Sequence, residues 1–161
     1  MKGASRWARM AIGGWEVNGI VALESGLYFN LISGRDNSGN GINLDRPDLI
    51  GNPYLPTDRP HAQLIARYFD PGAFRQNAPG TFGNFGRNVL EGPGKVAVDL
   101  GLTKSFFVTE RHRVQFRAEA FNALNRVNLD NPNANLSSAT VGRITSDGPP
   151  RVFQLALRYQ F

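Results

Sequence analysis

Four stretches of this sequence alternate apolar and polar residues with a period of two, each over about nine to thirteen residues. This period is typical of a β-strand whose two faces meet different surroundings. Strands of soluble proteins usually have about five or six residues, whereas a tilted strand needs about 9–11 residues to cross a bilayer. The pattern therefore predicts long strands over residues 12–24, 95–107, 111–122 and 151–161. The first strand could extend to residue 33 if the break at Ser25-Gly26 is a bulge.

One side of each predicted strand is apolar and the other carries small or charged residues. We expect the apolar side to face lipid and the polar side to face a water-filled lumen. The fold class that follows is all-β: an antiparallel, long-stranded sheet that forms about the last four strands of a transmembrane β-barrel. The residues expected to face the lumen are Asp99, Arg113, Gln115, Arg117, Glu119, Gln154 and Arg158.

The connections between the predicted strands alternate in length. A few residues join the second strand to the third, whereas loops of residues 34–94 and 126–150 make the other two connections. Outer-membrane barrels have long extracellular loops and short periplasmic turns. This layout places Trp15, Phe106 and Phe107 near the periplasmic interface, where an aromatic girdle is expected.

One short helix is predicted inside the first loop, in the stretch TDRPHAQLIARYF. Thr57 or Asp58 could cap it, and Pro60 would lie in the first turn. Leu64, Ile65 and Tyr68 would then share one face. This loop is therefore expected to be structured.

Composition excludes several classes of protein. The sequence has no run of about 18 apolar residues, which excludes a transmembrane helix, and it has no cysteine for disulfides or thiolate metal sites. The formal net charge is +5, but the 18 lysines and arginines are scattered, so nucleic-acid binding is not expected. Residues 1–6 carry charges without an apolar stretch behind them, so we expect no signal peptide in this chain.

No motif predicts catalysis or a cofactor, and we expect a protein that is not an enzyme. GPGK at residues 92–95 lacks the glycine and hydroxyl residues of a phosphate loop. DNSGNG resembles the start of a calcium loop through Asp36, Ser38 and Asn40, but Pro47 stands where the bidentate glutamate belongs. These three residues are a weak calcium candidate, and a polar loop is the favoured interpretation. His61 and His112 are interpreted as surface residues.

Several of these stretches together resemble the C-terminal end of Oar-like TonB-dependent outer-membrane receptors. They include GGWEVNGIVALESGLYF, YFDPGAF, GTFGNFGRNVLEGPGKVAVDLGLTKSF and RVQFRAEAFNALNRVNL. The resemblance covers roughly residues 11–161 and is most specific from Gly83 to Asn122. It implies a 22-stranded barrel with an N-terminal plug, and import of a ligand driven by the inner-membrane TonB complex.

This resemblance implies that residues 1–161 are a partial barrel, because four strands cannot close one. The expected partners are outer-membrane lipid, the barrel assembly machinery, the remaining barrel and plug, TonB through that plug, and an unknown ligand. The full-length protein is expected in the cell outer membrane. The resemblance also implies that the last strand carries the barrel-assembly signal on Phe161, Tyr159, Leu157 and Leu155.

Two other functions are compatible with the alternating pattern. One is a soluble extracellular β-sandwich that binds carbohydrate or protein, because sandwiches also alternate. The other is an outer-membrane adhesion barrel that transports nothing. The residues of this chain identify neither the ligand nor any calcium in the loops.

Overall fold

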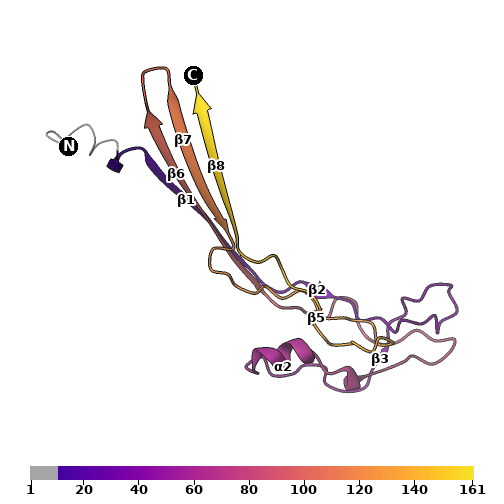
Figure 1. The fold of residues 1–161 in the computed structure, drawn as a ribbon. Helices are drawn as coiled ribbons and strands as arrows, with labels where there is room; N and C mark the ends of the chain where they lie inside the picture. The colour runs from indigo at the N-terminus through magenta and orange to yellow at the C-terminus, as the bar shows by residue number, and fades with distance from the viewer. Residues whose placement is uncertain (1–10) are drawn as a thin grey trace. The chain divides into compact units, whose positions relative to one another are not determined.

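The computed structural model describes residues 11–161. Four long strands form one antiparallel sheet in the order β1-β6-β7-β8 (Figure 1). They are β1 (Trp15–Glu24), β6 (Lys95–Phe107), β7 (Arg113–Phe121) and β8 (Val152–Gln160). The expected all-β class, with a long-stranded antiparallel sheet, is confirmed.

The predicted extension of the first strand to residue 33 is wrong. β1 ends at Glu24, and the next strand, β2 (Tyr28–Phe29), pairs with β5 (Leu90–Glu91) in a separate two-stranded sheet. Gly26 lies between them, and a Cβ there would lie 1.8 Å from the carbonyl oxygen of Gly92. Only glycine fits this close approach, and the chain then continues into the pairing of β2 with β5 instead of the long sheet.

The chain divides into two compact units, which we describe separately. The sheet unit contains the described residues up to 23, together with 96–127 and 149–161. The loop unit contains residues 24–95 and 128–148, so it combines both long loops.

The sheet unit has a continuous register from β6 to β8. Gly101 pairs with Glu119, and Glu119 pairs in turn with Gln154. A five-residue turn joins β6 to β7, in which the Val108 N–H donates to the carbonyl of His112 at 2.9 Å. No helix among residues 11–161 is long and apolar enough to cross a membrane.

The loop unit has little regular structure but a well-defined core. It contains β2, β5 and a second pair, β3 (Asp48–Leu49) with β4 (Phe74–Arg75), together with helix α2 (His61–Ala66) and the 3₁₀ turn η1 (Pro71–Ala73). Buried apolar residues from both strand pairs pack together. They are Phe29, Leu31, Phe69, Ala73, Phe74, Phe85 and Leu90.

Helix α2 corresponds to the predicted loop helix, but the expected cap is wrong. Pro60 is the N-cap, and no side chain caps the helix. The carbonyl of Pro60 instead accepts from the N–H groups of Gln63 and Leu64. Because proline fixes φ near the helical value, it starts the helix without a hydroxyl or carboxylate cap.

Candidate functional site

The polar face of the sheet brings together most of the residues predicted to line a lumen. In the register of β7 and β8, Gln115 lies opposite Arg158, and Glu119 lies opposite Gln154. Within β7, the Arg117 guanidinium forms a 2.5 Å ion pair with Glu119. Because alternate residues share one face of a strand, these side chains form one hydrophilic surface.

Arg113 lies at the turn end of this surface. Its guanidinium donates to the hydroxyl of Ser105 at 2.8 Å and lies 5.3 Å from the ring of Phe107. Phe106 and Phe107 therefore occupy opposite faces of β6. Of these two predicted girdle residues, only Phe106 lies on the apolar face.

Asp99, also predicted to face the lumen, does not pair with the arginines of β7. Its carboxylate accepts from the backbone N–H of Asn122 at 2.8 Å, and it forms no ion pair with any described residue. The register explains this result, because Asp99 lies beyond the last β6–β7 pair, Leu100 with Ala120. Asp99 thus stabilises the end of β7.

Asn122 has a structural role that sequence reasoning missed. Its backbone has a φ of 49°, and its side chain donates to the carbonyls of Arg126 and Pro149. Asparagine tolerates this left-handed conformation better than most residues. Asn122 therefore ends β7 and holds together the two ends of the second long loop.

The apolar face of the sheet is exposed over most of its area. The side chains of β8 on this face are more than half exposed, with Leu157 at 74%, and Phe161, which follows β8, is 93% exposed. A sheet of one layer that exposes so many apolar side chains is expected only where another apolar phase covers them. The proposed assembly-signal residues, Leu155, Leu157, Tyr159 and Phe161, all lie along this exposed row.

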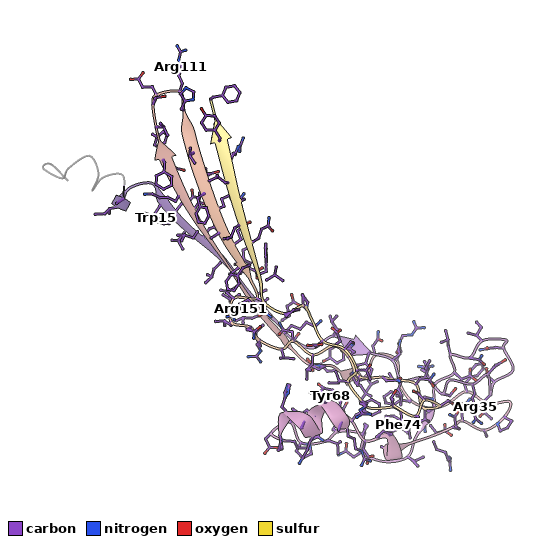
Figure 2. The ribbon with its side chains drawn as sticks, in the orientation of Figure 1. Trp15, Arg35, Tyr68, Phe74, Arg111 and Arg151 are labelled. Atoms are coloured by element: carbon purple, nitrogen blue, oxygen red, sulfur yellow. The ribbon has the colours of Figure 1, made fainter. Side chains whose placement is uncertain are left out.

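The end of the apolar face near Trp15 contains a lysine that sequence reasoning also missed. Lys104 follows Leu102 in the same alternation, yet it is only 2% exposed. Its ammonium donates to the carbonyls of Ala11 and Gly13 and lies 4.9 Å from the ring centre of Trp15. Phe106 lies against the same ammonium, and Figure 2 shows Trp15 at the start of β1.

His112 is not the plain surface residue that we expected. Its ring stacks on Tyr159 with a centroid distance of 5.8 Å, and Nδ1 forms a 2.6 Å hydrogen bond with the tyrosine hydroxyl. This contact joins the β6–β7 turn to the end of β8. The sequence did not indicate this contact, because the two residues are 47 positions apart.

The three calcium candidates lie in one loop, where each of their side chains forms hydrogen bonds within the protein. The Asp36 carboxylate accepts from the N–H groups of Asn40 and Gly41, and the Ser38 hydroxyl donates to Asp45 at 2.8 Å. No cluster of three His, Cys, Asp or Glu residues suited to a metal occurs in residues 11–161. Calcium binding here stays a prediction.

Asp45 anchors this loop from a buried position. Burial alone would raise the pKa of its carboxyl, but hydrogen bonds from Ser38, Asn77 and Asn37 outweigh it and hold the pKa below its ordinary value. The carboxylate is therefore charged at neutral pH and fixes the loop. A second such anchor is Asp130, whose pKa is lowered mainly by its hydrogen bond from Lys95.

The loop unit contains a cavity of about 310 Å³ near helix α2. Its walls include Phe29, Phe69 and Leu90 from the core, and its rim includes Tyr54, Arg59 and Glu91. Tyr68 also lines the cavity and follows α2 along the chain (Figure 2). Burial raises the pKa of the Tyr68 hydroxyl, and the negative charge of Glu91 adds to this effect. The Tyr68 hydroxyl therefore stays protonated and can donate a hydrogen bond.

Comparison with known proteins agrees with this geometry. A family model described as an outer membrane beta barrel domain matches residues 1–154. No curated protein and no solved structure matches the chain significantly. The long antiparallel strands, the exposed apolar face and this match lead to one conclusion: the chain belongs to the outer membrane β-barrel domain family.

Proposed function

We propose that this chain supplies four wall strands and two extracellular loops to a TonB-dependent transporter of the outer membrane. The observation that carries the proposal is the loop unit. Both long loops fold together around one apolar core, and this core borders a cavity. A preformed loop unit with a cavity suits ligand capture better than a wall-only role.

The two edges of the sheet support the barrel part of the proposal. β1 and β8 each have one strand neighbour in the described sheet, so one side of each has unpaired backbone groups. Such groups cost several kcal/mol each in lipid. Further strands are therefore expected to pair with β1 and β8 and close the barrel.

The soluble-sandwich alternative is not supported. A sandwich packs a second sheet on the apolar face, whereas Leu155 and Leu157 on that face are 69% and 74% exposed. The family match indicates an outer-membrane barrel instead. The adhesion barrel remains the second candidate, and the experiment below separates it from a transporter.

Solute depletion tests the transport proposal directly. Cells with and without the protein are grown in the presence or absence of a working TonB complex, and solutes lost from the medium are followed by mass spectrometry. We expect some solutes to be depleted only when both are present. Equal depletion without TonB would indicate a passive pore, and no depletion would indicate an adhesion or structural barrel.

A further inference from the structure

We propose that the cavity of the loop unit binds the apolar side chain of an amino acid or short peptide, with the neighbouring amino group at Glu91 and the carbonyl or carboxylate at Arg59. This inference rests on the proposed role of the loops in ligand capture. It names the chemical class of the ligand.

The inner wall of the cavity is apolar and aromatic. Phe29, Phe69 and Leu90 are each less than 10% exposed, and they belong to the core of the loop unit. Leu55 and Leu64 line the same space. A volume of about 310 Å³ lies at the lower end of the range for small-molecule sites. The cavity therefore fits one apolar group of about the size of a large amino-acid side chain.

The rim of the cavity carries charges of both signs. The Glu91 side chain is exposed and forms no hydrogen bond or ion pair with any described residue. The Tyr68 hydroxyl, which lines the same cavity, also lacks a hydrogen-bond partner among the described residues. The negative charge of Glu91 acts on this hydroxyl and raises its pKa. These two groups are available to a ligand that brings N–H donors.

Arg59 provides the opposite sign at a fixed position. Its guanidinium donates to the carbonyls of Pro56 at 2.7 Å, Arg67 at 3.0 Å and Tyr68 at 3.3 Å. Because a guanidinium has five N–H donors, two remain for a ligand oxygen. The three backbone contacts hold the positive charge in place at the rim.

An apolar wall with one anion and one cation at the rim matches a particular arrangement of ligand groups. An amino acid or a peptide N-terminus places a positive amino group and an acceptor oxygen next to an apolar side chain. A simple organic cation would leave Arg59 without a partner, and an organic anion would leave Glu91 without one. A sugar would place hydroxyl groups against the phenylalanine wall, which costs free energy without hydrogen bonds.

Binding is tested on the complete outer-membrane protein in detergent micelles, by isothermal titration and saturation-transfer NMR. The probes are L-phenylalanine, the dipeptide Phe-Ala, phenethylamine, 3-phenylpropionate and maltose. We expect Phe-Ala or phenylalanine to bind best, and the two compounds that lack one charged group to bind about tenfold more weakly. The two zwitterionic probes distinguish a free amino acid from a peptide end.

Three variants locate the binding. Glu91→Gln should weaken Phe-Ala and phenethylamine about tenfold but leave 3-phenylpropionate unchanged. Tyr54→Ala should weaken all aromatic probes about fivefold, whereas Phe82→Ala is the control, because Phe82 is an exposed aromatic residue of the same unit that does not line the cavity. Arg59 is left intact, since its contacts support the wall.

Several outcomes would overturn the inference. They are tighter binding of maltose, equal binding of phenethylamine and Phe-Ala, or Phe-Ala binding that Tyr54→Ala and Glu91→Gln do not weaken. Absence of any binding by wild type would do the same. Binding without TonB-dependent uptake would instead contradict the proposed transport function alone, so the two failures are distinguishable.

Discussion

The sheet unit and the loop unit treat apolar side chains in opposite ways. On β8, Leu157 is 74% exposed, whereas Leu31 of the loop unit is fully buried and Phe85 is 2% exposed. The apolar side chains of the sheet are covered only if an external apolar phase contacts them. The loop unit buries its apolar side chains within its own core. This difference shows that one chain of 161 residues is adapted to two solvents.

The largest effect on the difference between the two units is expected when part of the loop core is removed. Phe85 packs edge-to-face on Phe74 at a centroid distance of 4.9 Å. Phe85→Ala should cost about 3–5 kcal/mol of loop-unit stability. We expect limited proteolysis to cleave the loops of this variant rapidly while the β-strands stay protected.

A matched change at Phe82 serves as the control for that experiment. Phe82 is 74% exposed, so Phe82→Ala removes the same ring without opening the core. Equal protease sensitivity of the two variants would contradict the importance of the loop core.

A charge placed on either face of β8 tests the other half of the comparison. Leu155 and Gln154 are neighbours on opposite faces. Leu155→Arg should destabilise the inserted protein by about 2–4 kcal/mol, because it places a charge in lipid. Gln154→Arg should be nearly neutral, since Glu119 lies opposite it.

Unfolding by urea from lipid vesicles measures both effects. If the two arginine variants unfold at the same urea concentration, the apolar face does not contact lipid. A larger loss for Gln154→Arg would reverse our assignment of the two faces.

Deletion of Phe161 tests the proposed role of this residue in assembly. We expect lower outer-membrane levels of the complete protein than for Tyr159→Phe, which keeps the ring but removes the hydrogen bond to His112. Quantitative immunoblotting of outer membranes is the measurement. Unchanged levels after the deletion would show that Phe161 is not part of an assembly signal.

The smallest expected effect is a pH dependence confined to the loop unit. The pKa of Asp45 is lowered in the folded protein. Its contribution is therefore present at neutral pH and lost as pH falls from the ordinary aspartate pKa through the lowered one. Asp45→Asn should remove this acid dependence in hydrogen exchange of residues 33–45. Wild-type protection that stays constant through this range would contradict the effect.

The long strands could be predicted because their faces alternate without interruption. The predicted stretches 95–107 and 111–122 correspond to β6 (Lys95–Phe107) and β7 (Arg113–Phe121). The loop core could not be predicted, because Phe29, Phe69 and Phe85 come from segments with no regular period. Their packing depends on contacts between distant parts of the chain.

The candidate site could likewise be predicted only in part. The hydrophilic face of the sheet follows from period two, as the pairing of Gln115 with Arg158 illustrates. The roles of Asn122 and Lys104 do not follow, because each depends on backbone groups that a sequence does not bring together. The cavity at Tyr68 and Glu91 was missed for the same reason.

The composition of the loop unit from two separate segments has a kinetic consequence. The N–H of Ile32 donates to the carbonyl of Ala134, and the Ser137 hydroxyl donates to the carbonyl of Ser33, 104 residues earlier. Closing such long chain segments is slow, because their entropy is lost before the contacts form. The core of the loop unit can therefore be completed only after β6 and β7, which lie between its two segments, have been synthesised.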